Sequence, residues 1–241
     1  MEDAKPFYKH GWRMAGLILA FITLVGLGLF VWRTVYFYKE IKNGKTFEQA
    51  LTQDTAPKPL NPSQIKYLQS MKDYVSGKAT DPFAGPSSSS HEVVVFIDYD
   101  CPYSKQMVPI MRDFMKAKPD IKVTVLDFPV ADIHPEAMLP AIAARCVWNQ
   151  AKPDIYWAFH DRLFSEQGKH TAVDLRSFAK ELSVDIAAYD QCLSEAKTKK
   201  LVTNSETIGA RAGVRGTPTF FVDGGKLEGV VSVEQITALL R

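Results

Sequence analysis

Residues 93–104 have the sequence VVVFIDYDCPYS, in which an apolar run leads into a cysteine and a proline. Residues 93–97 are all apolar and mostly β-branched, a composition typical of a strand that is buried on both faces. Pro102 stands where the first turn of a helix tolerates proline, and apolar residues recur after it at helical spacing as far as Lys118. The sequence therefore predicts that Cys101 lies at the carboxyl end of a buried strand and at the N-terminus of a helix.

This predicted position makes the thiol of Cys101 a candidate nucleophile. Backbone N–H groups in the first turn of a helix lack partners, and together with the helix dipole they stabilise an anion. A thiolate forms more easily there, and the thiolate is the reactive form of cysteine. The alternative is that Cys101 is a small buried residue, as most lone cysteines are.

Residues 96–106, FIDYDCPYSKQ, resemble the active-site segment of DsbA-like thiol–disulfide oxidoreductases, a branch of the thioredoxin fold. The family pattern is a pair such as Cys-Pro-Tyr-Cys after a strand whose last residues carry an aspartate. The resemblance implies that Cys101, Pro102 and Tyr103 belong to the catalytic turn. Ser104 completes this turn in place of the second, resolving cysteine, and a hydroxyl cannot form a disulfide. Ser104 is either natural, giving a monothiol protein, or the engineered substitution that traps mixed disulfides, and the sequence leaves both possibilities open.

A second motif, GTPTFF at residues 216–221, resembles the cis-proline loop of the same fold, which lies against the active-site cysteine. The resemblance implies a cis bond between Thr217 and Pro218, although only about 5% of X-Pro bonds in folded proteins are cis. It also implies that these two residues bind the main chain of an extended substrate. Together the two motifs predict an α/β thioredoxin-like fold of DsbA type, with a helical insertion at about residues 134–212.

Residues 121–129 predict a second strand, and a strand–helix–strand unit implies parallel pairing with a right-handed crossover. Residues 135–214 then show helical stripes without strand-like alternation. Cys146 and Cys192 fall on inward faces of two of these helices, which predicts a structural disulfide that requires an oxidising compartment. It would close a loop of about 47 residues and stabilise the fold by roughly 4 kcal/mol. The alternative is two buried thiols that never meet, which the spacing alone does not exclude.

The N-terminal segment predicts a membrane anchor. Residues 14–32 are apolar apart from Thr23, and at about 1.5 Å per residue such a helix spans the hydrocarbon core of a bilayer. A buried helix in a soluble core is the alternative. Basic residues flank both ends, so the cysteines, rather than the charges, are the reason to expect the domain on the extracytoplasmic side. The predicted organisation is a flank at 1–13, a transmembrane anchor at 14–36, a stalk at 37–80 with a short amphipathic helix at about 62–76, and a thioredoxin-like domain at 81–241 that begins with a flexible lead-in at 81–90.

Composition and the remaining titratable residues restrict the partners. The chain has 29 basic and 27 acidic side chains, a net charge of +2 and well-mixed signs, so nothing indicates nucleic-acid binding. Asp98 and Asp100 either act on the nearby thiol, by opposing its ionisation or accepting its proton, or are solvated residues at a strand end. Neither a metal nor a cofactor is predicted, because no ligand spacing relates the cysteines to the histidines His91, His134, His160 and His170.

The predicted function is thiol–disulfide exchange on exported proteins that contain cysteines. Because Ser104 cannot resolve a mixed disulfide, turnover needs an external thiol: the substrate's second cysteine, a small-molecule thiol or a membrane redox partner. A peroxiredoxin would carry a Pro-x-x-x-Thr-x-x-Cys approach before Cys101, and a glutathione transferase relative would replace the cysteine itself with serine; the sequence has neither feature. The alternative that remains is a non-catalytic, membrane-tethered domain that binds extended peptides beside Thr217 and Pro218.

Overall fold

The computed structural model describes residues 23–36, 38–39, 61–63, 66, 80–150, 152–223 and 225–240. The chain divides into two compact units, Met1–Ala56 and Pro57–Arg241. In the first unit, residues 23–36 are helical and exposed. No helix among the described residues has the length and apolarity needed to cross a membrane. Residues 14–22 of the predicted anchor and most of the predicted helix at about 62–76 lie outside the described residues, so both stay predictions.

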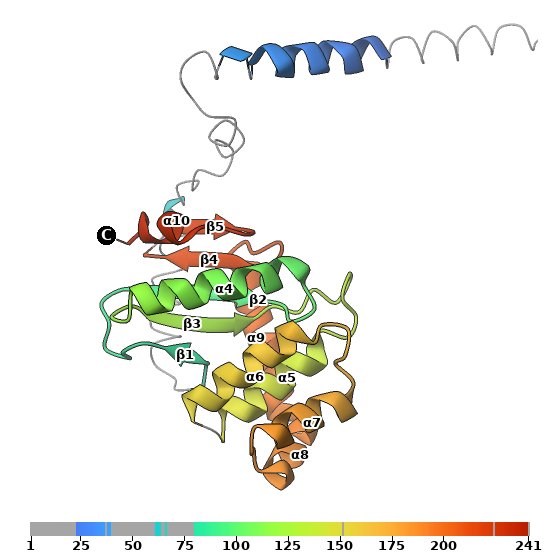
Figure 1. Ribbon diagram of the computed structural model, residues 1–241, viewed down its shortest axis with the longest axis vertical. Coiled ribbons are helices and arrows are strands. Elements are labelled where there is room, and N and C mark those ends of the chain that lie inside the picture. Colours follow the sequence, from blue (N-terminus) through green and yellow to red (C-terminus); the bar gives the residue numbers. More distant parts are fainter. Residues whose placement is uncertain are drawn as a thin grey trace, which may run out of the picture. The chain divides into compact units, whose positions relative to one another are not determined.

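The second unit is built around a mixed sheet, whose strand order in the described residues is β1-β3-β2-β4-β5 (Figure 1). The strands are β1 (Phe83–Ala84), β2 (Glu92–Ile97), β3 (Lys122–Asp127), β4 (Thr219–Val222) and β5 (Gly225–Glu228). β2 and β3 are parallel and are connected through helix α4 (Pro102–Ala117), whereas the other neighbouring strands pair antiparallel. The predicted strand–helix–strand unit and the mixed α/β class are therefore confirmed.

β2 is buried on both faces, as its apolar run predicts. Val93 and Val95 belong to the larger core cluster, whereas Phe96, which alternates with them along the strand, belongs to a smaller cluster on the opposite face. Gly209 belongs to helix α9 (Ala196–Arg211). A Cβ atom at this position would come within 2.7 Å of the Phe128 ring, so glycine allows α9 to lie close to this second face. Helix α4 covers the first face with the buried side chains of Met107, Met111 and Phe114.

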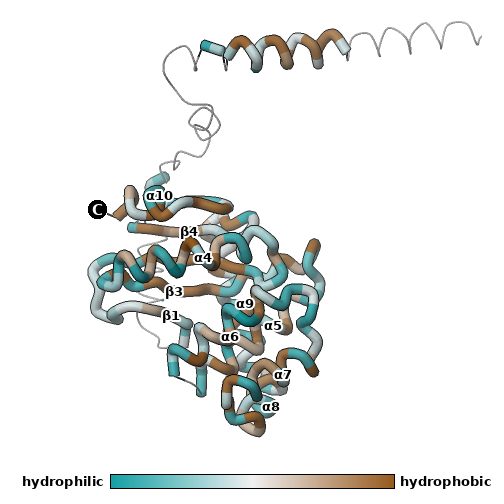
Figure 2. Tube along the Cα trace, in the orientation of Figure 1, coloured by the Kyte–Doolittle hydropathy of each residue, from teal (hydrophilic) through white to brown (hydrophobic). Residues whose placement is uncertain are grey.

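The segment between β3 and β4 is helical. It contains α5 (Met138–Trp148), α6 (Pro153–Ser165), α7 (Ala172–Glu181), α8 (Ile186–Ser194) and α9 (Ala196–Arg211). A disulfide joins Cys146 on α5 to Cys192 on α8, with 5.6 Å between the Cα atoms. After β5, helix α10 (Val233–Thr237) ends the described domain, and Ser232 caps its N-terminus. Figure 2 shows hydrophobic and hydrophilic residues alternating along α4, as expected of a helix with one face on the core.

A buried arginine connects four parts of this domain. Arg145 on α5 donates to Asp127 at the end of β3 (Nε–Oδ2 2.5 Å), to Asp81 before β1, and to Ser205 on α9 (Nη2–Oγ 2.9 Å). Burial alone would lower the pKa of Arg145, but the two carboxylates outweigh burial and hold its pKa above the ordinary value. The flexible lead-in predicted at 81–90 is wrong for its first residues, because Arg145 binds Asp81 and the strand β1 pairs with β3.

Candidate active site

Cys101 lies between the end of β2 and the start of α4. It is the N-cap residue of α4, and its carbonyl oxygen accepts from Lys105 N at 3.1 Å. Its side chain is 5% exposed, and it is the free cysteine of the described chain because Cys146 and Cys192 are joined. A thiol therefore sits in the first turn of a helix, next to backbone N–H groups that favour an anion.

The cis-proline loop lies against this thiol. The bond between Thr217 and Pro218 is cis, and the thiol of Cys101 donates to the carbonyl oxygen of Thr217 at 3.1 Å. The hydroxyl of Thr217 is buried and has no hydrogen-bond partner among the described residues. The structure thus brings together the two motifs that lie more than 100 positions apart in the sequence.

The other residues of the predicted catalytic turn divide between solvent and core. Pro102 and Tyr103 are exposed, Tyr103 at 59%, whereas Ser104 is 2% exposed. The Oγ of Ser104 accepts from Asp98 N at 3.5 Å, so the hydroxyl points back toward the end of β2. Position 104 is therefore on the buried side of the turn.

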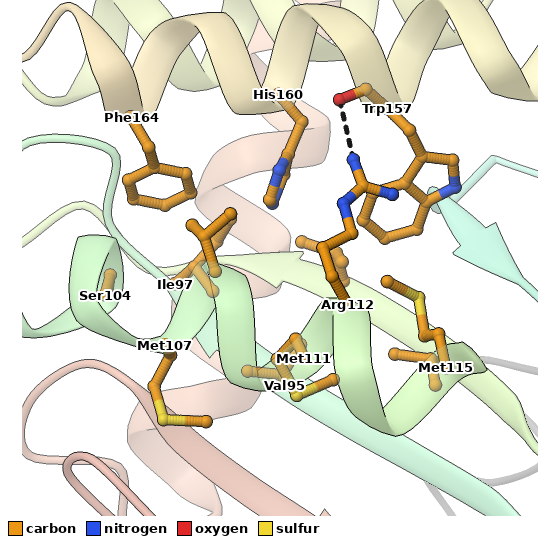
Figure 3. A pocket seen from close by; sticks show the side chains of 13 residues that line it. Val95, Ile97, Ser104, Met107, Met111, Arg112, Met115, Trp157, His160 and Phe164 are labelled. Carbon is orange, nitrogen blue, oxygen red and sulfur yellow. Dashed lines mark hydrogen bonds between the residues drawn. The ribbon is translucent and has the colours of Figure 1, made fainter. Parts of the chain in front are cut away.

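Ser104 also contributes to a small apolar pocket between α4, the sheet and α6 (Figure 3). At the other end of the pocket, Arg112 donates to the carbonyl oxygen of Trp157 at 3.0 Å. The lining between these ends is dominated by apolar side chains, among them Val95, Ile97, Met107, Met111, Met115 and Phe164. Position 104 therefore borders the free space of this pocket.

Asp98 organises the turn that precedes the cysteine. Its carboxylate accepts from the backbone N–H groups of Asp100 at 2.8 Å and Val130 at 2.9 Å, and from His134 Nδ1 at 2.8 Å. The alternative prediction of a solvated strand-end residue is wrong for Asp98, which is 2% exposed. Two of these three donors, Val130 N and His134 Nδ1, come from the loop after β3, so the sequence around Asp98 could not reveal them. Through this contact with Asp98, His134 supports the active-site turn.

A second set of contacts comes from the turn after α6, and sequence reasoning missed it. His170 Nδ1 lies 2.6 Å from Asp100 Oδ1, and Gln167 Nε2 donates to the carbonyl oxygens of Tyr99 (2.8 Å) and Cys101 (3.0 Å). Gln167 and His170 are more than 60 positions from the residues they hold, and no local pattern signals such a contact.

Among the described residues, no group of three potential ligands is arranged to hold a metal ion.

The chain is similar in sequence to proteins of two kinds, antiporters and disulfide bond formation proteins. The chain is 29% identical over 158 residues to Na(+)/H(+) antiporter NhaA 1 of Salinispora arenicola, which covers 66% of this chain and 24% of the antiporter. It is 26% identical over 178 residues to disulfide bond formation protein D of Bacillus subtilis, which covers 68% of this chain and 78% of that protein. The chain spans about a quarter of the length of the antiporter relatives that it matches.

A solved structure with the same fold is the thiol-disulfide exchange protein alpha-DsbA2 of Wolbachia pipientis. The TM-score is 0.65 at 20% sequence identity, and the match covers 73% of this chain and 93% of the other. At this identity the likeness concerns the fold alone. The family model described as thioredoxin matches residues 78–241, which is more than half of the chain. The chain therefore belongs to the thioredoxin family, and its fold is that of the DsbA-like proteins.

Proposed function

We propose that this chain carries out thiol–disulfide exchange on exported proteins, with Cys101 as its single reacting thiol. The observation that carries the proposal is the contact between the Cys101 thiol and the Thr217 carbonyl of the cis-proline loop, at the N-terminus of α4. The relative named disulfide bond formation protein D supports the same class of chemistry.

Each step of the exchange keeps the number of disulfides and the number of thiols constant. The Cys101 thiolate attacks one sulfur of a substrate disulfide, a mixed disulfide forms, and the other substrate sulfur leaves as a thiolate. A second thiolate then attacks the mixed disulfide and releases Cys101 as a thiolate again. Because Ser104 has no sulfur, the attacking thiol comes from outside the chain. When it is a second cysteine of the substrate, it closes a new substrate disulfide, which gives isomerisation. Reduction takes two external thiols, from a small molecule or a membrane redox partner: the first attacks the Cys101 sulfur and releases the substrate as a dithiol, and the second attacks the new mixed disulfide, releases Cys101 and leaves the two external thiols joined.

The surroundings of Cys101 support a polypeptide substrate. Three exposed apolar side chains stand beside residues of the site: Tyr103 two positions after the cysteine, Ile133 next to His134, and Val230 in the loop after β5. The last loop is tied to the cis-proline because Gly229 N donates to the carbonyl oxygen of Pro218 at 2.9 Å. Exposed apolar groups next to residues of the site suit unfolded or partly folded chains, which expose apolar residues of their own.

The proposed location is the extracytoplasmic side of a membrane. The disulfide between Cys146 and Cys192 supports an oxidising compartment, because such bonds are rare where cellular thiols are kept reduced. The apolar composition of residues 14–32 supports a single-helix anchor.

Intact-mass measurement of the full-length chain after exposure to oxidised glutathione tests the proposal. We expect one adduct that a reductant removes, carried by Cys101, while Cys146 and Cys192 stay joined. A Cys101→Ser variant is the control and should take no adduct. If Cys101 stays unmodified in the folded chain, redox exchange is contradicted and the domain is better described as a binder of extended peptides.

A further inference from the structure

Both ring nitrogens of His170 face hydrogen-bond acceptors. Nδ1 lies 2.6 Å from a carboxylate oxygen of Asp100, and Nε2 lies 2.9 Å from the carbonyl oxygen of Leu163. Neither oxygen can donate, and a neutral imidazole carries a single N–H, so it satisfies one of these contacts and leaves the other unmade. The imidazolium donates to both. With only 6% of His170 exposed, water has little access to replace a missing contact.

The same turn holds the backbone of the active-site segment. Gln167 donates to the carbonyl oxygens of Tyr99 and Cys101, and His170 holds the side chain of the residue between them, Asp100. Three consecutive residues that end at the reacting cysteine are thus fixed by two side chains from the turn after α6.

We propose that Gln167 and His170 are positioning residues for Cys101, and that the ion pair of His170 with Asp100 couples the reactivity of the thiol to the charge of His170. The inference uses the proposed function only in taking Cys101 as the reacting group.

The electrostatic reason is the carboxylate directly before the cysteine. A negative charge at Asp100 disfavours a thiolate at Cys101, and an imidazolium at 2.6 Å largely cancels that charge. The other charged groups around His170 are Asp174 on α7, which also favours the imidazolium, and the exposed ion pair of Lys169 with Glu166 on the same turn. When His170 loses its proton, Asp100 becomes uncompensated and one of the two hydrogen bonds is lost.

The balance of these effects favours the charged form of His170. Burial alone would lower the pKa of His170, but the hydrogen bonds to Asp100 and to the Leu163 carbonyl outweigh burial and raise the pKa above its ordinary value. Below this raised pKa, the imidazolium of His170 therefore makes both contacts and holds the turn against Cys101.

The test is the pH profile of Cys101 alkylation by iodoacetamide in the full-length chain, with the Cys146–Cys192 disulfide intact. In the wild type, the rate should rise with pH and show an extra inflection where His170 titrates. In His170→Gln that inflection should disappear, and at about pH 6 the rate should fall roughly threefold to tenfold, because the Asp100 charge is no longer compensated.

A matched control is His91→Gln. His91 also pairs with an aspartate, Asp223, at 2.6 Å, but it precedes β2 and is thus at the end of the strand away from Cys101. The control should keep the wild-type profile. If His170→Gln also keeps the wild-type profile, or if both variants change it alike, the inference is overturned.

Asp100→Asn provides a second variant should His170→Gln fail to fold. It removes the charge while keeping the size of the side chain, so alkylation above the pKa of His170 should be faster than in the wild type; an unchanged rate overturns the inference. Failure of the proposed function is separate: a wild type that shows the inflection but forms no adduct with oxidised glutathione contradicts disulfide exchange and leaves the positioning role standing.

Discussion

The thiol of Cys101 donates to the carbonyl oxygen of Thr217 at 3.1 Å. This contact exists only while the thiol carries its proton. Once Cys101 is a thiolate or part of a mixed disulfide, it cannot donate, and the Thr217 carbonyl oxygen is left free to accept from another group. Under the proposed function, that group is the main chain of the substrate. An added strand of substrate can then supply an N–H to the same oxygen.

Replacing the Cys101 thiol by a hydroxyl should leave the fold stable and abolish the reaction with glutathione. In Cys101→Ser the O–H group can donate to Thr217, so the free energy of unfolding should stay within about 1 kcal/mol of the wild type, the net value of one such hydrogen bond. Chemical denaturation measures this stability, and mass spectrometry should show no glutathione adduct. A variant that fails to fold would show that the sulfur is needed for packing as well as reaction.

Ser104→Cys should restore a redox-active pair. Residues three apart at the start of a helix lie within the Cα separation of roughly 4.4–6.8 Å that a disulfide spans, and position 104 borders a pocket. With oxidised glutathione as the oxidant, we expect a disulfide between positions 101 and 104 and turnover in the oxidation of a reduced peptide, which the wild type should lack. The double variant Cys101→Ser with Ser104→Cys is the control. A folded Ser104→Cys variant in which both thiols stay free contradicts the expectation.

Arg145→Leu should destabilise the domain strongly. The variant leaves Asp127 and Asp81 buried without their cation, and breaking a buried pair in this way costs about 3–5 kcal/mol. The free energy of unfolding in urea provides the measurement. Arg176→Leu is the matched control, because Arg176 pairs with Asp190 on the exposed surface and should matter much less. Equal effects of the two substitutions would contradict this account of Arg145.

The parts of the fold that the sequence predicts are those with local patterns. The apolar run of β2, Pro102 at the start of α4 and the GTPTFF segment each carry their structure in a few adjacent residues. Arg145 and His170 give no such signal, because a buried charge is indicated only by partners that the helices bring from distant positions. The solvated alternative for Asp98 fails for the same reason.

The disulfide between Cys146 and Cys192 should contribute to stability through the unfolded chain. The two cysteines are 46 positions apart, and removing a native cross-link of this kind costs about 2–5 kcal/mol. The double variant Cys146→Ala with Cys192→Ala should lose this amount in urea unfolding, and the reduced wild type should behave like the variant. An unfolding midpoint that neither change moves would contradict the prediction.

Stability should also fall on acidification because of His160. This residue lies in an aromatic cluster on α6, with ring centroids 5.0 Å from Phe164 and 5.1 Å from Trp157. Burial lowers the pKa of His160, and its hydrogen bond to Asp161 offsets this only in part. In the unfolded chain the ring takes up a proton near its ordinary pKa of about 6.5. As the pH falls below that value, the unfolded state binds the proton first, and stability is lost until the pH reaches the folded pKa.

His160→Phe isolates this effect, because phenylalanine keeps an aromatic ring in the cluster and cannot take up a proton. The free energy of unfolding should therefore fall less between about pH 7 and pH 5 in the variant than in the wild type, by no more than about 1.4 kcal/mol per pH unit for a single proton. The difference between the two pH profiles of the free energy of unfolding isolates His160. His170, whose pKa is raised, contributes with the opposite sign in both proteins, and its contribution cancels in that difference. Parallel pH profiles of stability would show that His160 does not resist protonation in the folded domain.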